Sequence, residues 1–362
     1  MKRFKTYKQI LSGVLALSMS LSLSVTSFAA PPESPLPEIK YVSLGDSMTN
    51  GYGLAGYDGN VGVEDYGEES YANKFKAWLI SEGYASSVDH AQLAMSAMRA
   101  EDLHWFLELD YTDPVAVAVS DMFPWDESIW NSTFTTGDYW TWHEITHDYR
   151  AEIAATYILA KQGNPDAIAA LADNPNAHTS MSGEAGLVAE YYQSSVKDAD
   201  IISLSIGNGN FGVFALGRLM EAIGFGEEDK EAAASKAMLY KLENAVRECD
   251  SAIQEKIFEL EAAIYEKVSP LRVMFVDFTD TQWMALLNTV LYTSVSYALN
   301  YAGTIDAILN LNPDTEIILV ALMNTLADSD GALDYANISS IGDVMSAIFE
   351  PLNIYIAALP LK

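Results

Sequence analysis

Four short apolar segments, separated by stretches with helical patterns, constrain the fold of this chain more than any other feature of its sequence. They span residues 39–44, 88–95, 201–206 and 316–322. Each has the length and composition of a strand that is largely buried in a sheet. Strands that alternate with helices form a mostly parallel sheet with helices on both faces. The sequence therefore predicts an α/β fold of three layers.

The stretches around these strands predict the helices of the fold. Apolar residues recur at helical spacing over residues 71–81, 189–197, 228–268 and 282–309. The third stretch contains no proline or glycine, so we expect one long helix there. Residues 273–278 are again apolar and predict a fifth strand. The chain has 362 residues, half of them hydrophobic, which is enough for one large domain over residues 38–362.

The first 30 residues differ from the rest of the chain. Four basic residues precede an apolar run over residues 10–25, and small residues follow at Ala29 and Ala30. This order predicts a secretory signal peptide over residues 1–30, cleaved after one of these alanines. An uncleaved membrane anchor is the alternative, but the run is short and rich in serine. The Pro-rich residues 31–37 predict a linker. We therefore expect a secreted, extracellular protein without stable membrane insertion after cleavage.

The charge and the cysteine content exclude several classes of function. The chain carries 50 acidic and 20 basic residues, a formal net charge of −30. An acidic exterior repels nucleic acids and anionic membranes, so neither is an expected partner. The single cysteine, Cys249, excludes an internal disulfide and is expected to be a small core residue.

A long segment between the second and third strands, residues 103–181, is unusually rich in aromatic residues. It holds five of the seven tryptophans of the chain, at positions 105, 125, 130, 140 and 142. An insertion of this kind over the end of a sheet predicts a lid or a substrate platform. The alternative is a small core of its own beneath the insertion.

Polar or glycine-rich turns follow three of the expected strands. Gly45-Asp46-Ser47 follows the first, Ser96-Ala97 follows the second, and a Gly-Asn-Gly-Asn-Phe-Gly turn over residues 207–212 follows the third. In α/β proteins the carboxyl ends of the strands meet at the edge where ligands bind. The three turns together supply a hydroxyl, a backbone N–H and amide donors, which is what a developing oxyanion needs. Gly-Asp-Ser alone is common in ordinary turns. The two other polar turns at the same edge of the sheet are what favour a functional site.

These turns resemble sequence blocks of the SGNH, or GDSL-type, hydrolases, a family of esterases and lipases. The resemblance covers residues 38–362 and implies a flavodoxin-like three-layer parallel sheet, here with a long aromatic insertion after strand two. It implies that Ser47 is the serine nucleophile, and that the backbone N–H groups of Ser47 and Ala97 belong to the oxyanion hole. The family has glycine where this chain has Ala97. Its asparagine donor aligns with Gly209, so the flanking Asn210 and Asn208 are both candidates, and we favour Asn210. The resemblance implies no cofactor and no metal.

The last block of the family, Asp-x-x-His near the C-terminus, is absent from this sequence, and no histidine follows His178. In the family this histidine is the general base and the aspartate holds it. Two explanations remain open, a C-terminally truncated sequence, which we favour, and a base supplied from elsewhere. A serine hydroxyl without a base is a poor nucleophile at neutral pH. The fragment is therefore expected to be inactive if no histidine reaches Ser47.

Two other readings of the sequence remain. His143-Glu144-Ile145-Thr146-His147 matches the H-E-x-x-H pattern, in which two histidines on one helix face bind zinc and the glutamate is the base of a metallohydrolase. The missing base also makes a non-catalytic binding module on a degenerate hydrolase fold credible. We expect instead a secreted esterase that hydrolyses a carboxylic ester through an acyl-enzyme on Ser47. Its substrate would be a small-molecule ester, an O-acyl group on a glycan or a lipid ester, and the aromatic insertion suits the last two equally.

Overall fold

The computed structural model describes residues 36–52, 54, 67–96, 98–108, 155–156, 158–160, 162–173, 185–322 and 338–359. The chain divides into two units, Met1–Pro37 and Glu38–Lys362. The described helices and strands all belong to the second unit. The expected signal peptide, and most of the expected linker, lie outside the described residues.

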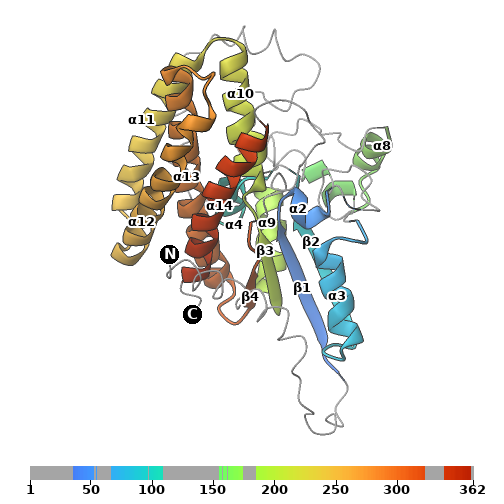
Figure 1. The fold of residues 1–362 in the computed structure, drawn as a ribbon. Helices are drawn as coiled ribbons and strands as arrows, with labels where there is room; N and C mark the ends of the chain where they lie inside the picture. The colour runs from blue at the N-terminus through green and yellow to red at the C-terminus, as the bar shows by residue number, and fades with distance from the viewer. Residues whose placement is uncertain are drawn as a thin grey trace. The chain divides into compact units, whose positions relative to one another are not determined.

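Four parallel strands form the sheet at the centre of this unit (Figure 1). They are β1 (Glu38–Gly45), β2 (Ser87–Ala94), β3 (Ile201–Ser205) and β4 (Glu316–Leu319). Their order across the sheet is β2-β1-β3-β4, and every neighbouring pair is parallel. The prediction of an α/β fold with a parallel sheet is confirmed, and the four strands lie where the apolar segments predicted them.

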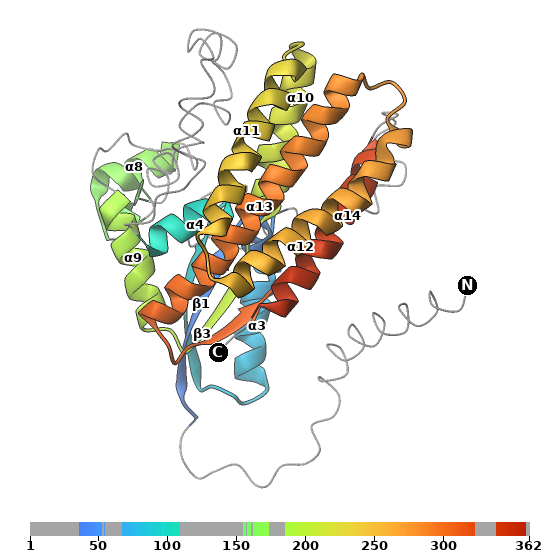
Figure 2. The same cartoon turned by 90° about the vertical axis from the view of Figure 1, so that its left-hand side faces the viewer.

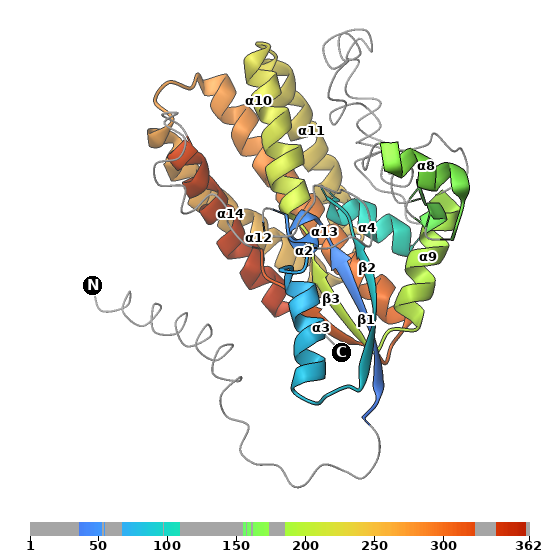
Figure 3. The same ribbon diagram turned by 90° about the vertical axis from the view of Figure 1, so that its right-hand side faces the viewer.

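Helices cover both faces of the sheet and complete three layers (Figures 2 and 3). One face carries α3 (Tyr71–Ser81), whose apolar residues pack with Tyr41 and Val88 of the sheet. The other face carries α4 (Ala100–Leu107), α9 (Ala185–Lys197) and α13 (Asp280–Leu311), which share one core with Leu44, Leu93 and Leu204. The alternation of side chains along a strand explains why adjacent residues enter different cores.

The second half of the chain adds a layer of helices around α13. These helices are α10 (Leu216–Gly224), α11 (Glu228–Arg247), α12 (Ser251–Val268) and α14 (Ile338–Ala358). Helices α11 and α12 both pack on α13, and α14 packs on α12 and α13. Most residues of α13 are buried, since it is enclosed between the sheet and these helices. No helix among the described residues is both long enough and apolar enough to cross a membrane.

Two expectations for this half of the chain were wrong. The long helix over residues 228–268 is two helices, because Asp250 interrupts it and caps α12 by accepting the backbone N–H of Ala252. The expected fifth strand at residues 273–278 is a 3₁₀ helix, η3 (Ser269–Met274), followed by a turn. The guanidinium of Arg272 donates to the carbonyl oxygens of Phe275 and Phe278, which fixes this turn. Apolar composition alone did not distinguish the turn from a buried strand.

The segment between β2 and β3 is described only in part. Its first residues belong to α4, which packs on α9 and α13 as part of the domain. A further helix, α8, spans Pro165–Asp173. Most of the expected insertion over residues 103–181, with four of its tryptophans, lies outside the described residues.

Candidate active site at the carboxyl ends of the strands

The first strand ends in a tight turn that places Ser47 at the start of a short helix. Gly45 is the last residue of β1, and a Cβ atom there would clash with the carbonyl oxygen of Ser205 on β3. Asp46 caps the helix α2 (Ser47–Asn50) by accepting the backbone N–H of Met48 at 3.0 Å. Ser47 is therefore the first helical residue, at the carboxyl end of β1.

The carboxylate of Asp46 joins the ends of β1 and β3. Its Oδ2 atom accepts the backbone N–H groups of Gly207, Asn208 and Gly209 at 3.0, 2.8 and 3.3 Å. Asp46 is fully buried, and this burial raises its pKa to about 6, against the lowering effect of the four N–H groups. The two turns are thereby held together although they are about 160 residues apart. In a sheet of this order, the crevice between β1 and β3 is the expected ligand site.

Ser47 follows Asp46 in this turn, and its polar groups are available. It is half-buried, and neither its hydroxyl nor its backbone N–H makes a hydrogen bond with a described residue. The neighbouring N–H of Met48 is occupied by Asp46, and Thr49 donates its hydroxyl to the carbonyl of Ser205 at 3.1 Å. The groups beside Ser47 are thus fixed, whereas Ser47 itself can meet a ligand.

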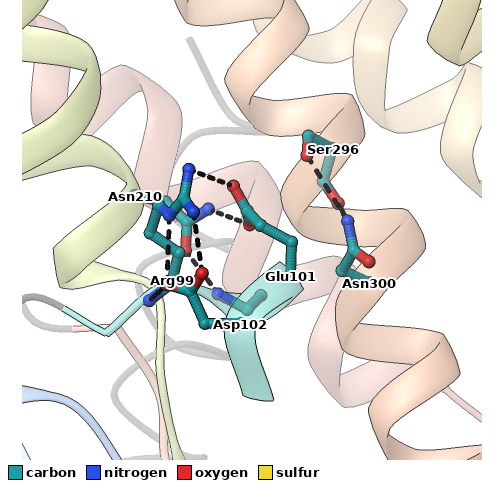
Figure 4. Close-up of polar contacts among 7 residues, drawn as sticks. Arg99, Glu101, Asp102, Asn210, Ser296 and Asn300 are labelled. Atoms are coloured by element: carbon teal, nitrogen blue, oxygen red, sulfur yellow. Dashed lines mark hydrogen bonds and ion pairs between the residues drawn. The ribbon is translucent and has the colours of Figure 1, made fainter. Parts of the chain in front are cut away.

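The two asparagines of the third turn have different surroundings. Asn208 is half-buried, and its carboxamide makes no hydrogen bond with a described residue. Asn210 is 1% exposed and is the second residue of a π-helix, η2 (Gly209–Ala215). Its Oδ1 atom accepts the N–H of Ala100 at 2.9 Å, and its Nδ2 atom donates to Glu101 at 2.7 Å (Figure 4). Asn210 therefore joins η2 to α4, while Asn208 keeps its amide group for a ligand.

A buried ionic cluster at the start of α4 holds Asn210 in place (Figure 4). Arg99 donates to both carboxylate oxygens of Asp102, at 3.0 and 2.7 Å, and lies 3.6 Å from Glu101. All three side chains are at least nine-tenths buried. The guanidinium thus binds two carboxylates, and one of them, Glu101, also accepts the amide of Asn210, so the cluster supports the third turn. Sequence reasoning missed this cluster, because no recognised spacing links Arg99 to Asn210.

Three further residues belong to this edge of the sheet. Ser96 is buried and follows β2, and the N–H of Met95 donates to the carbonyl of Gly45. Ala97, the expected second oxyanion donor, lies outside the described residues. Asn50 ends α2 and is fully buried, and neither polar atom of its side chain bonds to a described residue. A buried polar group without a partner costs about 1–3 kcal/mol. Within the described part of the chain, Asn50 is therefore an unsatisfied polar residue three positions after Ser47, and the sequence motif did not indicate it.

The described histidines are committed to other partners. His90, on β2, bonds to Ser43 at 2.9 Å and stacks on Tyr41 with ring centroids 4.4 Å apart. Burial lowers its pKa to about 3, so its ring stays neutral. His104, on α4, bonds to Asn300 at 3.0 Å and packs against α13. No contact among the described residues links either ring to Ser47.

The alternative zinc motif, His143, Glu144 and His147, lies outside the described residues. Within the described part of the chain, no three metal-binding side chains gather into a group that would hold a metal ion. Comparisons of this chain with models of protein families, with curated proteins and with solved structures found no match. The geometry of the crevice is therefore the basis for assigning a function.

Proposed function

We propose that this protein is a serine hydrolase of the SGNH type that cleaves carboxylic esters through an acyl-enzyme on Ser47. The observation that carries this proposal is the buried carboxylate of Asp46, which binds the serine turn to the glycine-rich turn after β3. Ser47 and Asn208 belong to the two turns that this carboxylate ties together, which supports a shared site for the hydroxyl and the amide. The strand order β2-β1-β3-β4 agrees with the first four strands of a flavodoxin-like sheet.

The two asparagines take separate roles in this proposal. Asn208 and the backbone N–H of Ser47 donate to the oxyanion of the tetrahedral intermediate, since neither group is occupied by a described residue. Asn210 is a positioning residue, because Ala100 and Glu101 already engage its carboxamide. This reverses the preference for Asn210 drawn from sequence. Removal of one oxyanion donor typically lowers kcat about 100-fold or more, so Asn208→Ala is expected to lose activity while the protein stays folded.

No histidine among the described residues contacts Ser47, so the general base is a group whose contact with Ser47 is not described. The sequence holds five histidines, and His90 and His104 are engaged elsewhere. His143, His147 and His178 remain as candidates within the chain. Alanine replacement of each of the five gives a complete search: one variant loses hydrolysis while its fold is retained, if the base lies in this sequence. Hydrolysis that persists in all five variants would show that none of these histidines is the base.

The substrate is proposed as an ester outside the cell, either an O-acyl group of a glycan or a lipid ester. The proposal follows from the secretory leader and the acidic charge expected of the mature chain. An array of acylated glycans and lipid esters, assayed for released acid, distinguishes the two classes.

Hydrolysis of p-nitrophenyl acetate by the purified chain tests the reaction itself. Ser47→Ala is expected to abolish it, and Ser194→Ala is the matched control, because Ser194 is exposed on α9 and donates to the carbonyl of Tyr191. Equal rates for the parent and Ser47→Ala would contradict the proposal. A folded parent that hydrolyses no ester, together with an equally inactive extended gene product, would instead favour the non-catalytic binding module.

A further inference from the structure

A second concave site lies at the opposite edge of the sheet, at the amino ends of the strands. It is a groove of about 840 Å³, and its floor is formed by Ile39 of β1, Ile201 of β3 and Ile318 of β4. These three side chains lie on the face of the sheet that carries α3, and Ile318 remains 37% exposed. Ile39 lies roughly 20 Å along β1 from Gly45, and Ser47 lies two residues beyond Gly45. The described lining of the groove includes neither Ser47 nor the turn after β3, so the groove is separate from the proposed active site.

Three aromatic side chains form one wall of the groove. Phe75 and Trp78 of α3 stack with ring centroids 5.7 Å apart, and Trp78 lies 5.0 Å from Tyr84. Trp78 is 43% exposed and Tyr84 is 49% exposed, although both line a concave surface. Large aromatic side chains of this kind are usually buried, and neighbouring exposed rings in a groove are typical of a binding surface.

The opposite rim of the groove is strongly acidic. Four carboxylates line it, against one ammonium group, that of Lys197; they belong to Asp198, Asp200, Asp314 and Glu316. Asp198 pairs with Lys40 at 3.4 Å, and Asp200 accepts the backbone N–H of Lys40. Asp314 and Glu316 are exposed, and neither forms an ion pair with a described residue. A ligand in this groove therefore meets negative charge that the protein does not neutralise.

The helices around the groove add to this negative potential. Helices α3, α9 and α13 end at Ser81, Lys197 and Leu311, next to residues that line the groove. The carboxyl end of a helix carries partial negative charge on its last carbonyl groups, which favours a cation nearby. The rim carboxylates and the helix ends thus both favour a positively charged ligand.

We propose that this groove binds a small organic cation with apolar substituents, a quaternary ammonium compound such as choline. The rings attract a cation through their negative faces, the isoleucine floor accepts its alkyl groups, and the carboxylates supply the opposite charge. The volume is that of a small-molecule site rather than of a protein interface. The site does not depend on catalysis at Ser47.

Titration of choline into the purified chain, followed by ligand-observed NMR at constant ionic strength, tests the proposal. The probe for charge is the neutral isostere of choline, in which carbon replaces nitrogen. Saturable binding of choline in the millimolar range is expected, roughly tenfold tighter than binding of the isostere. Absence of saturation, or equal affinity for the two compounds, would overturn the proposal.

Two sets of variants locate the binding. The double variant Asp314→Asn/Glu316→Gln changes exposed side chains and is expected to weaken choline binding roughly fivefold, with no effect on the isostere. Tyr84→Leu is expected to weaken it roughly threefold. The matched control, Glu255→Gln/Glu259→Gln, removes the same charge from exposed positions on α12 and should leave binding unchanged. An equal loss in the control would assign the effect to overall charge and contradict the groove.

Discussion

The two edges of the sheet are each held by one polar side chain, but with opposite chemistry. At the carboxyl ends of the strands, Asp46 accepts four backbone N–H groups. At the amino ends, the Nδ2 atom of Asn312 donates to the carbonyl groups of Val196, Lys197 and Ala199, at 3.1, 3.2 and 2.8 Å. One edge therefore collects N–H groups and the other collects carbonyl groups.

This difference explains why the two edges suit different ligands. The groups that remain for a ligand differ in charge. At the carboxyl ends they are the N–H of Ser47 and the amide of Asn208, which no described residue engages and which would meet an oxyanion. At the amino ends they are the carboxylates of Asp314 and Glu316, which favour positive charge. Burial differs as well: Asp46 is fully buried, whereas Asp314 and Glu316 at the other edge are exposed. The buried contacts of Asp46 fix the geometry of the two turns, which a reaction requires. The exposed carboxylates of Asp314 and Glu316 can instead bind a solvated cation.

Among the variants that distinguish the two edges, Asp46→Ala is expected to have the largest effect on stability. This variant leaves several buried N–H groups without an acceptor, so the free energy of unfolding is expected to fall by about 4 kcal/mol. Asp314→Ala, the same change at the exposed edge, is expected to alter it by less than about 0.5 kcal/mol. Urea unfolding measures both. Similar losses for the two variants would contradict the structural role of Asp46.

Gly45→Ala tests the close approach of β1 and β3. A Cβ atom at position 45 would clash with Ser205 and Thr49, so the strands must separate, and a loss of about 3 kcal/mol is expected. Gly186→Ala is the control, because a Cβ atom in α9 at that position meets no neighbouring atom and is expected to stabilise the helix by up to about 1 kcal/mol. Thermal unfolding distinguishes the two outcomes, and a tolerated alanine at position 45 would argue against the tight turn.

Asn312→Ala tests the opposite edge and is expected to cost less than Asp46→Ala. Its carboxamide is half-buried, and the three carbonyl groups that it satisfies can be hydrated after the change. The expected loss is about 1.5 kcal/mol, measured by urea unfolding. A loss larger than that of Asp46→Ala would reverse the proposed difference between the two edges.

Glu261, on α12, gives the smallest effect and belongs to neither edge. Burial and the nearby carboxylate of Glu243 raise the pKa of Glu261 to about 7. Between pH 4.5 and 7 the folded state therefore holds a proton that the unfolded state releases, and this group lowers stability as pH rises through that window. The glutamine of Glu261→Gln does not titrate, so this pH-dependent contribution to stability is absent from the variant.

The variant is therefore expected to be more stable than the parent at pH 8, by less than about 1 kcal/mol because Glu261 is only partly buried, and equal to it at pH 4. Thermal unfolding across this range, compared between the two proteins, removes the contribution of Asp46, whose pKa is also raised. A parent that gains stability relative to the variant as pH rises would contradict the assignment.

The local parts of this fold were predictable from sequence, and the long-range contacts were not. Short segments of strand-like length and apolar composition predicted all four strands, most clearly β1 and β3, whose residues are mostly buried. The turn at residues 273–278 has the same composition, yet the contacts of Arg272 with two carbonyl groups make it a turn. Asp250 caps α12, and no proline or glycine marks the break in the sequence, so the helical pattern alone did not reveal it.

At the candidate site, the sequence indicated the turns and the structure supplied their connection. Ser47 and the Gly-Asn-Gly-Asn turn could be named from their motifs. The contact of Asp46 with Gly207, and the support of Asn210 by Glu101, join residues more than 100 positions apart. No local pattern encodes such pairs, and a single sequence carries no record of their covariation.

The central claim, that Ser47 is an activated nucleophile in the crevice between β1 and β3, is tested most directly by locating a covalent adduct. The purified chain is treated with a fluorophosphonate, digested, and analysed by mass spectrometry. One labelled serine is expected, at position 47, with no label in Ser47→Ala. Label taken up equally on exposed serines such as Ser194, or no label at Ser47 in either the folded chain or an extended gene product, would contradict the claim.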